Sequence, residues 1–233
     1  MKELTIIANK YSTDKGTEKC PDGGVHGSLP CHGFTEFYDE YFNNYKHNNP
    51  CILEIGVAEG GSTKMFYEYY ESQCELYCID ISDSSKSVEM LGPNVHFKKI
   101  DQSNVKSLEE FTSFLDENNI KFDIIIDDGS HKSDDMMLTF KYLNKYLKLN
   151  GIYIFEDLHC IYSSRFSKDI NDDKYLPISF FIKHTDYYTY TKEENELLHK
   201  KIKQSILFSA ENKYNRPHEE FRIGMTMIVY LNE

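Results

Sequence analysis

Three acidic side chains in this chain follow short apolar runs, and a histidine lies close to one of them. Asp128 follows one run, with His131 three residues further on, and Glu156 and Asp157 follow the next run. If these runs are neighbouring parallel strands, their carboxyl ends meet at one edge of the sheet. Crowded carboxylates repel one another and raise one another's pKa, and a divalent ion relieves that repulsion. Asp128, Glu156 and Asp157 therefore predict a site for Mg²⁺, with Mn²⁺ or Ca²⁺ as alternatives, because every ligand is an oxygen.

His131 is expected to act as a general base beside this ion. A bound cation lowers the pKa of a hydroxyl group, and imidazole exchanges protons near neutral pH. We therefore predict that His131 and Asp128 are catalytic, with Asp134 and Asp135 orienting the imidazole ring. In the alternative interpretation, the acidic residues only cap helices or end strands, and His131 is an ordinary residue at a helix N-terminus. His159 is a rival base or an additional metal ligand, but its spacing does not favour it over His131, and a solvated loop position is expected.

An earlier apolar run ends in a glycine-containing turn that leads into a helix, which Ser62 can cap. Gly56, Gly60 and Gly61 let the backbone bend sharply and approach a ligand closely. They lack the G-x-G-x-x-G spacing of dinucleotide sites. Glu54, just before the turn, would repel a pyrophosphate but attract a ligand that carries an ammonium and a sulfonium group.

The next two apolar runs also end on residues that suit a nucleoside. Asp80 can accept hydrogen bonds from both hydroxyl groups of a ribose. Asp101 and Gln102 are expected close to an adenine amino group. Lys15 is predicted to reach the carboxylate of the same ligand, and an exposed surface position is the equal alternative for this lysine.

These residues lie in a pattern of short apolar runs that alternate with amphipathic stretches. This pattern is typical of βα units and a parallel sheet. Strands are expected at 51–55, 76–79, 95–100, 122–126 and 151–155, followed by two late strands at 206–209 and 224–231. Helices are expected at 62–70, 85–91, 107–118, 132–147 and 192–204. The late strands indicate an antiparallel pair at one sheet edge. The predicted fold class is therefore doubly wound α/β.

The N-terminal segment differs in character from the rest of the chain. We predict that residues 1–48 form a lid or cap on a main domain over residues 49–233, with a substrate-facing insertion near 158–190. Aromatic residues at helical spacing predict an apolar face that docks on another element: Phe34, Phe37, Tyr38 and Tyr41. Four cysteine and histidine residues of this segment have a spacing that matches no common zinc site, which favours a loop without metal. They are Cys20, His26, Cys31 and His32.

Composition limits the partners of this chain. Its 233 residues carry a formal net charge of -12, which opposes broad binding to nucleic acid or to anionic membranes and favours a small molecule. No apolar stretch reaches the length of a membrane helix, and the first residues do not resemble a signal peptide. Scattered cysteines in a chain of this size are expected as reduced thiols, so a cytoplasmic location is predicted. Association of copies with one another stays open.

The cofactor pattern resembles that of the class I S-adenosylmethionine-dependent methyltransferases over about residues 50–157. The resemblance rests on Glu54-x-Gly56-x-x-x-Gly60 followed by Asp80, Asp101 and Asp127. It implies a seven-stranded, Rossmann-like sheet with an antiparallel last strand. It further implies that S-adenosylmethionine lies over the first turn and across the ends of strands two to four, with Asp127 among its contacts.

The acidic cluster is similar to that of metal-dependent O-methyltransferases of the catechol and caffeoyl-coenzyme A type. It resembles more closely the macrolide-sugar O-methyltransferases of the mycinamicin and macrocin type, through the run from Asp127 to His131, the Glu156-Asp157 pair and the segments 11–16 and 32–38. This resemblance implies Mg²⁺ on Asp128, Glu156 and Asp157, and His131 as the base. The implied acceptor is a sugar hydroxyl of a nucleotide-sugar, a capsule or surface polysaccharide, or a glycosylated natural product.

Two other functions stay open at this stage. One is a methyltransferase of the same fold that acts on a phenol, an amine or a phosphorylated small molecule. The other is a protein that binds S-adenosylmethionine without catalysis. Tyr187, Tyr188 and Tyr190 are interpreted either as an aromatic platform for a sugar or as a buried patch.

Overall fold

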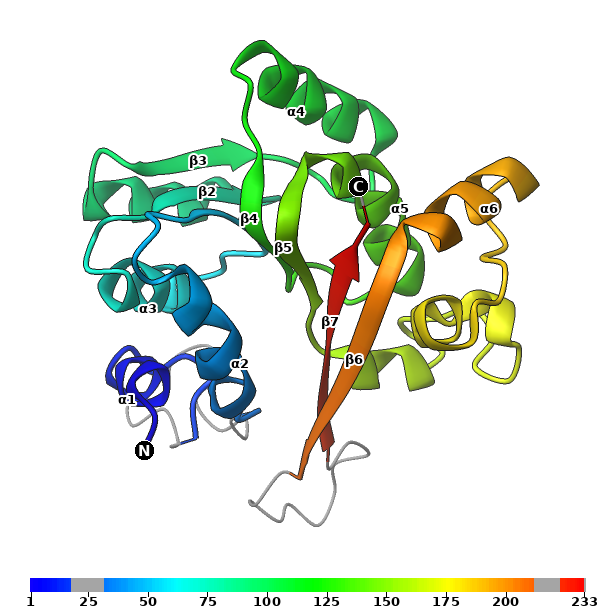
Figure 1. The fold of residues 1–233 in the computed structure, drawn as a ribbon, viewed down its shortest axis with the longest axis horizontal. Helices are drawn as coiled ribbons and strands as arrows, with labels where there is room; N and C mark the ends of the chain where they lie inside the picture. The colour runs from blue at the N-terminus through cyan, green and yellow to red at the C-terminus, as the bar shows by residue number, and fades with distance from the viewer. Residues whose placement is uncertain (18–31, 212–222, 233) are drawn as a thin grey trace.

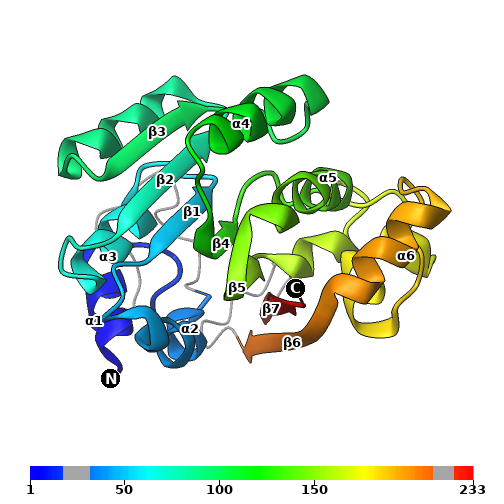
Figure 2. The same cartoon turned by 45° about the horizontal axis from the view of Figure 1, so that its top comes forward.

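The computed structural model describes residues 1–17, 32–211 and 223–232. The apolar runs form a seven-stranded sheet in the order β3-β2-β1-β4-β5-β7-β6, with helices on both faces (Figure 1, Figure 2). The strands are β1 (Cys51–Ile55), β2 (Glu75–Asp80), β3 (Val95–Lys99), β4 (Phe122–Asp127), β5 (Leu147–Phe155), β6 (Ile202–Glu211) and β7 (Ile223–Leu231).

Strands β1 to β5 run parallel, whereas β7 runs antiparallel to β5 and β6. In the register of the central strands, Asp127 lies beside Ile55 on one side and beside Phe155 on the other. The residues that follow β1, β4 and β5 therefore emerge at the same edge. This topology confirms the predicted doubly wound sheet with an antiparallel last strand.

The helices fill the connections between the strands. They are α1 (Glu3–Lys10), α2 (Thr35–Phe42), α3 (Gly61–Tyr69), α4 (Val105–Glu117), α5 (Ser133–Leu143) and α6 (Lys192–Lys201). Shorter helical turns include η2 (Asp83–Leu91), η4 (Leu158–Tyr162), η5 (Asp173–Tyr175) and η6 (Ser179–Lys183).

Several observed elements depart from the predicted ones, among them β5, which begins at Leu147, and β6, which spans Ile202–Glu211. The segment expected as a helix at 85–91 is a 3₁₀ helix, η2. Helix α5 ends four residues before the predicted 147, because a 3₁₀ turn and the start of β5 follow it. Helix α6 ends at Lys201 because β6 begins at the next residue. Helix α1 was not predicted.

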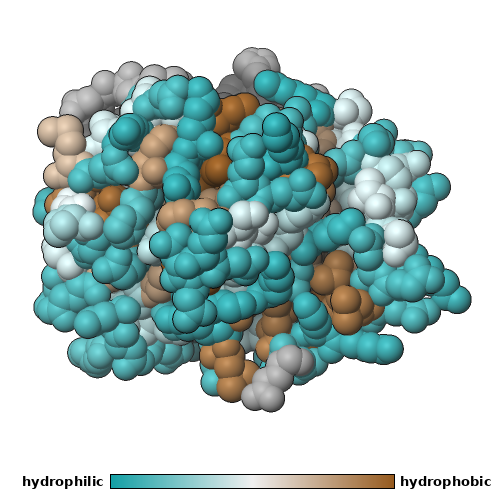
Figure 3. Space-filling view, turned by 90° about the horizontal axis from the view of Figure 1, so that it is seen from above, coloured by the Kyte–Doolittle hydropathy of each residue, from teal (hydrophilic) through white to brown (hydrophobic). Residues whose placement is uncertain are grey.

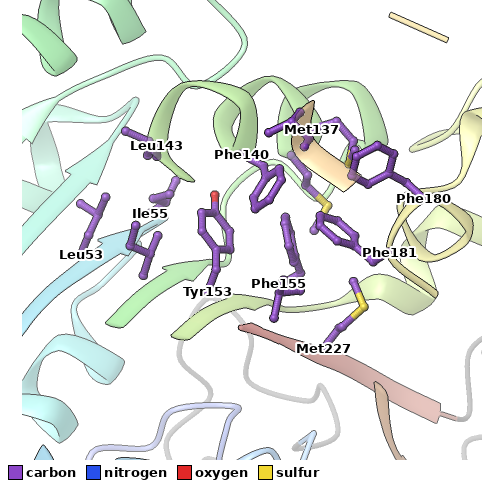
Figure 4. Close-up of a cluster of buried hydrophobic side chains, with 14 of the residues drawn as sticks. Leu53, Ile55, Met137, Phe140, Leu143, Tyr153, Phe155, Phe180, Phe181 and Met227 are labelled. Atoms are coloured by element: carbon purple, nitrogen blue, oxygen red, sulfur yellow. The ribbon is translucent and has the colours of Figure 1, made fainter. Parts of the chain in front are cut away.

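Alternating residues of the strands build two cores, one on each face of the sheet. Leu53 and Ile55 of β1 belong to the core under α4 and α5, whereas Ile52 belongs to the core under α1, α2 and α3. Figure 4 shows Phe140 of α5 packed against Phe155 of β5 in the first core. Period-two burial of apolar residues on both faces is what a doubly covered sheet requires.

The N-terminal helices are part of the second core. Leu4 of α1 and Phe42 of α2 are fully buried, and the ring of Phe42 lies 5.7 Å from that of Phe66 in α3. The apolar face predicted for the aromatic segment therefore docks against α3 and the sheet. Residues 18–31 lie outside the described residues, and with them Cys20, His26 and Cys31 of the cluster considered for zinc.

The tyrosines of the insertion lie mainly inside the fold. Tyr187 and Tyr190 are buried, and the Tyr187 hydroxyl donates to Asp134 Oδ1 at 3.0 Å. Tyr190 donates to the carbonyl oxygen of Met137 in α5. A sugar platform built from Tyr187 and Tyr190 is therefore wrong, because their rings fill the core; Tyr188 is half-buried.

The surface agrees with the acidic composition. Hydrophilic residues cover most of the face seen in Figure 3, with hydrophobic residues in separate patches. In the described part of the chain, no helix combines the length and the apolar character needed to cross a membrane. Four of the cysteines are described, and each is a free thiol as expected: Cys51, Cys74, Cys78 and Cys160.

Candidate active site

A cavity of about 260 Å³ opens at the carboxyl ends of the first four strands. Gly56, Asp80, Asp101 and Gln102, all predicted to contact a cofactor, line it. This is the edge at which open α/β sheets bind ligands. Several other residues that line the cavity were not predicted to contact a cofactor: Ile81, Ser103, Ser130, Lys132 and Asp135. Ile81 and Ser103 directly follow predicted residues, so their position could have identified them.

The turn after β1 brings two backbone segments into close contact. Gly56 has a φ of +86°, and a Cβ atom there would lie 2.1 Å from the carbonyl oxygen of Asp128. Asp80 Oδ2 accepts hydrogen bonds from the backbone nitrogens of Val57 and Ala58 at 2.8 and 3.1 Å. One oxygen of Asp80 thus holds the turn, so the carboxylate is fixed at the cavity wall.

Glu54 and Ser62 lie behind this wall instead of lining the cavity. The carboxylate of Glu54 is fully buried and accepts hydrogen bonds from Ser62 Oγ and from Thr63 Oγ1, the latter at 2.5 Å. Burial raises the pKa of Glu54 to about 7, although both hydroxyl groups oppose that shift. Gly60, the N-cap residue of α3, has a φ of +75° and is likewise absent from the lining. The predicted cofactor contacts of these three residues stay predictions.

Asp127 is also enclosed by protein. Gln102 Nε2 donates to Asp127 Oδ1 and to Thr139 Oγ1, each at 3.1 Å, while Gln102 Oε1 accepts from the backbone nitrogen of Ser130 at 2.6 Å. Burial raises the pKa of Asp127 to about 7. The amide of Gln102 is therefore engaged on both sides, and Asp127 lies away from the cavity lining.

Asp128 and Glu156 meet at a buried lysine from the N-terminal segment. Lys15 Nζ donates to Asp128 Oδ2 and to Glu156 Oε2, the latter at 2.6 Å, and only 1% of Lys15 is exposed. Burial disfavours the ammonium ion, but the two carboxylates outweigh that effect and hold the pKa of Lys15 well above its usual value. The surface alternative for Lys15 is therefore excluded. Its predicted cofactor contact stays a prediction, because its ammonium lies on the proposed metal ligands.

Burial also acts on the acidic partners of Lys15. It raises the pKa of Asp128 and raises that of Glu156 well above its usual value, because charged carboxylates lose their hydration. Tyr38 Oη donates to Glu156 Oε1 at 2.9 Å. The N-terminal segment thus supplies two of the groups that fix Glu156, and no local sequence pattern indicated this role for Tyr38.

Asp157 faces three imidazole rings. Its Oδ2 lies 3.7 Å from His131 Nε2, and its Oδ1 lies 3.6 Å from His32 Nε2 and 3.9 Å from His159 Nδ1. Burial opposes ionisation of Asp157, but the electrostatic effect of His32, His131 and His159 outweighs it and holds the pKa of Asp157 below its usual value. His159 is therefore not a solvated loop residue as predicted, because it packs beside His32 with 5.5 Å between ring centroids.

His131 lies beside the two aspartates but not beside its predicted orienting residues. His131 Nδ1 is 4.0 Å from Asp128 Oδ1. Asp134 instead accepts from Tyr187 and Tyr188, and Asp135 accepts from Ser130 Oγ at 2.7 Å. The prediction that Asp134 and Asp135 orient His131 is wrong, because helix α5 turns both side chains toward other partners.

The backbone at this edge carries local strain. His131 and Asp157 both have left-handed conformations, with φ values of +57° and +52°. Such conformations cost about 1 kcal/mol or more for residues other than glycine, and they concentrate at functional sites. The strain is consistent with a backbone held in place to aim these two side chains.

The donor set fits a divalent ion. Ligand atoms of Asp128, His131 and Asp157 all lie within 4.8 Å of one another. His131 Nδ1 is buried and has no hydrogen-bond partner among the described residues. Buried polar atoms without partners are costly, and a bound ion is one of the groups that satisfy them.

Comparison with known proteins agrees with this arrangement. A family model described as a methyltransferase domain matches residues 53–158. The chain is 32% identical over 164 residues to the 8-demethyl-8-alpha-L-rhamnosyl tetracenomycin-C 2'-O-methyltransferase of Streptomyces olivaceus, covering 66% of this chain and 41% of that protein. It is 32% identical over 179 residues to the demethylmacrocin O-methyltransferase of Streptomyces fradiae, covering 74% and 40% respectively. The chain thus spans about two fifths of the length of these relatives.

A solved structure shows the same fold. The MycE methyltransferase from the mycinamycin biosynthetic pathway, in complex with Mg, SAH and mycinamycin VI, aligns with a TM-score of 0.70 at 23% identity. The alignment covers 98% of this chain and 54% of that chain. These comparisons confirm the resemblance to methyltransferases and the fold class expected from the sequence.

Proposed function

We propose that this chain, which carries a methyltransferase domain over residues 53–158, transfers a methyl group from S-adenosylmethionine to a sugar hydroxyl beside a divalent ion. The observation that carries the proposal is the convergence of Asp128, His131 and Asp157, whose ligand atoms lie within 4.8 Å of one another. Gly129 and Ser130, between Asp128 and His131 in the chain, line the adjoining cavity. This arrangement supports a base and a metal site next to a space that suits a nucleoside.

The cavity wall supports the assignment of the methyl donor. S-adenosylmethionine, when bound, supplies an electrophilic methyl group. Asp80 and Asp101 offer carboxylate oxygens for ribose hydroxyl groups and for an adenine amino group, and Ile81 offers apolar surface for a ring. Gly56 keeps the first turn free of a Cβ atom that would collide with the backbone of Asp128. We propose that Gln102, which lines the cavity, contacts the cofactor, and that Glu54, Gly60, Ser62 and Asp127 support this wall from behind.

Asp128, Glu156 and Asp157 would hold the ion, and Mg²⁺ suits their oxygen atoms best. When bound, a divalent ion lowers the pKa of an acceptor hydroxyl group. Lys15 holds Asp128 and Glu156 together, and it reduces the charge of the three carboxylates from -3 to -2. One divalent ion balances that remaining charge, which supports a single ion among these three residues.

His131 accepts the proton of the acceptor hydroxyl in this proposal. The imidazole is partly exposed, so an acceptor can approach it. Asp157 Oδ2 at 3.7 Å from Nε2 and Asp128 Oδ1 at 4.0 Å from Nδ1 stabilise the imidazolium that forms. The proton therefore moves from the substrate oxygen to a ring that has negative charge on both sides.

The names of the relatives support a sugar as acceptor. The tetracenomycin-C enzyme is named for a rhamnosyl group, and a further relative is the mycinamicin VI 2''-O-methyltransferase of Micromonospora griseorubida. We propose a hydroxyl of a nucleotide-sugar, a capsule or surface polysaccharide, or a glycosylated natural product. The net charge of -12 and the free thiols support a small-molecule partner and a cytoplasmic location.

The test measures S-adenosylhomocysteine formed by the full chain with a panel of nucleotide-sugars and glycosides. We expect transfer to a sugar that stops after chelation and returns with Mg²⁺. His131→Ala should lower kcat by about 100- to 10,000-fold while the affinity for S-adenosylmethionine is kept. His96→Ala, on a partly exposed strand position, is the matched control.

Three results would contradict the proposal. Full activity after removal of the metal would refute the role of the ion. Transfer only to phenols, amines or phosphorylated molecules would refute the sugar acceptor. Binding of S-adenosylmethionine without turnover on any acceptor would favour a binding protein.

A further inference from the structure

Asp157 has a side that the proposed reaction does not use. Its Oδ2 faces His131 and the cavity side of the site, whereas its Oδ1 faces His32 and His159. Ligand atoms of His32, Asp157 and His159 all lie within 4.8 Å of one another. The two oxygens of one carboxylate therefore serve two separate groups of side chains.

The second group is shielded from water. Asp157 Oδ1 is buried and has no hydrogen-bond partner among the described residues, and the His32 nitrogen that faces it is Nε2. Only 15% of the His32 side chain and 12% of the His159 side chain are exposed. A buried carboxylate oxygen without a partner is costly unless a cation or a donor satisfies it. The arrangement therefore points to a ligand that takes electron pairs from one oxygen and two nitrogens.

We propose that His32, Asp157 and His159 form a binding site for a divalent transition-metal ion of the Zn²⁺ type. Two imidazoles and one carboxylate suit Zn²⁺, Co²⁺ or Ni²⁺, whereas Mg²⁺ prefers oxygen ligands. In a tetrahedral zinc site with bonds of about 2.0 Å, ligand atoms lie about 3.3 Å apart. The observed 3.6 Å and 3.9 Å from Asp157 Oδ1 to the two histidine nitrogens are close to that value.

The fold brings these ligands together from two segments of the chain, one before α2 and one at the start of η4. His32 precedes α2, and its ring stacks on Phe34 with centroids 5.1 Å apart. His159 is the second residue of η4, and this helical turn begins directly after Asp157, which has a left-handed backbone conformation. The two imidazoles lie 5.5 Å apart by ring centroid at an angle of 37°. Three protein ligands leave one tetrahedral position open, which is typical of exchangeable or catalytic zinc rather than of closed structural sites.

Sharing of Asp157 makes the two metal sites antagonistic. One divalent ion already balances the net charge of -2 left by Asp128, Glu156, Asp157 and Lys15. Among the described residues, Asp14 adds one further carboxylate, at 4.0 Å from His32 Nε2. Each ion therefore weakens the other through their mutual repulsion. We expect Zn²⁺ at the histidine site to inhibit any reaction that needs Mg²⁺ on Asp157.

The test titrates the chelator-treated full chain with Co²⁺ in excess Mg²⁺ and records the visible absorption of tetrahedral Co²⁺. Competition with Zn²⁺ then gives the zinc affinity. His32→Asn and His159→Asn should each abolish the absorption band and weaken Zn²⁺ binding by at least about 100-fold, because loss of groups that merely orient a ligand already costs about 10- to 100-fold. His96→Asn is the matched control and should leave both unchanged.

The outcomes separate this site from its neighbour and from the proposed reaction. An unchanged Co²⁺ band in both His32→Asn and His159→Asn would overturn the proposal, as would a band lost only in His131→Asn. Zinc affinity that does not fall as Mg²⁺ rises would overturn the predicted antagonism. If the band depends on His32 but no methyl transfer is found, the zinc site stands and the proposed function fails. If methyl transfer is found but the band does not depend on His32 or His159, only the zinc site is rejected.

Discussion

Lys15 places a positive charge between two buried carboxylates. Its ammonium contacts Asp128 and Glu156, and it is 1% exposed. Removing one partner of a buried ion network costs about 3–5 kcal/mol, because uncompensated charge stays buried. We therefore predict that Lys15→Met lowers the free energy of unfolding by that amount in metal-free buffer. Mg²⁺ should restore part of it, so that the variant gains more stability from Mg²⁺ than the natural chain does.

Denaturant unfolding with and without Mg²⁺ measures this difference. Lys106→Met, at an exposed position of α4, provides the control and should unfold like the natural chain in both buffers. Equal stability gains from Mg²⁺ in the Lys15→Met variant and in the natural chain would contradict the role given to Lys15.

Glu54 predicts a pH dependence of stability. Burial raises its pKa to about 7 in the folded chain from a usual value of 4.5. Between these two values the folded state binds more protons than the unfolded state, so the free energy of unfolding falls as pH rises. A shift from 4.5 to about 7 corresponds to about 3 kcal/mol. Glu54→Gln should therefore reduce the fall of the free energy of unfolding with rising pH. The variant keeps the part of this pH dependence that comes from Asp127, whose pKa is also about 7.

Chemical denaturation at a series of pH values from 4.5 to 8 tests this expectation. Glu59→Gln, exposed in the same turn, should keep the slope of the natural chain. If Glu54→Gln unfolds with an unchanged slope, Glu54 does not titrate in this range.

Residue types and spacing predicted the part of the site that follows strand ends. Asp128, His131 and Asp157 were found from local sequence and are brought together by the fold. Lys15 and His32 could not be placed in the same way, because Lys15 lies 113 residues from Asp128 and 141 from Glu156, and His32 is similarly remote in the chain from Asp157. No local pattern specifies such a contact, and only the packing of the N-terminal segment creates it.

Helix α2, part of the N-terminal segment, contacts the sheet edge through the hydroxyl group of Tyr38. Tyr38 is fully buried, its Oη lies 2.9 Å from Glu156 Oε1 and 2.8 Å from Thr226 Oγ1, and Thr226 donates to the carbonyl oxygen of Phe155. Removing this hydroxyl leaves buried partners unsatisfied, at a cost of about 1–3 kcal/mol. We predict that Tyr38→Phe lowers stability by that amount and weakens Mg²⁺ binding, since Glu156 loses a group that orients it.

Thermal unfolding and calorimetric titration with Mg²⁺ check both parts of the prediction. Tyr41→Phe is the matched change on the same helix, because the Tyr41 ring packs edge-on against Phe208 and is only half-buried. Equal Mg²⁺ affinity in the Tyr38→Phe and Tyr41→Phe variants would show that Tyr38 does not position Glu156.

At the scale of elements, strands were easier to predict than helices. The strand expected at 51–55 matches β1 because its apolar residues are buried on both faces, a constraint that leaves a continuous signal in the sequence. The short α1 was missed because only Leu4, Ile7 and Ala8 mark its apolar face. The segment at 85–91 was expected to be an α-helix, but it is a 3₁₀ helix with few buried residues to specify it.

Across the whole molecule, the N-terminal segment carries both core and site residues. Leu4 and Phe42 are fully buried beside the sheet, and Lys15 lies inside the acidic cluster. A lid that opens would have to expose this apolar surface and break the contacts of Lys15. We therefore propose that the described part of residues 1–48 is a fixed wall of the domain rather than a mobile cap.

Amide hydrogen exchange on the full chain distinguishes a fixed wall from a lid. Exchange protection reports the free energy of local opening, which ranges from about 0 for mobile segments up to the global value for core elements. We expect amides inside α2 to exchange as slowly as those of the central strand β1, and to share their dependence on denaturant. In the Lys15→Met variant without Mg²⁺, protection of α2 should fall before that of β1, because the contact that ties the segment to Asp128 and Glu156 is lost. Fast exchange of α2 in the natural chain, with β1 still protected, would instead mean that the segment opens independently and that its buried residues contribute little to holding the domain together.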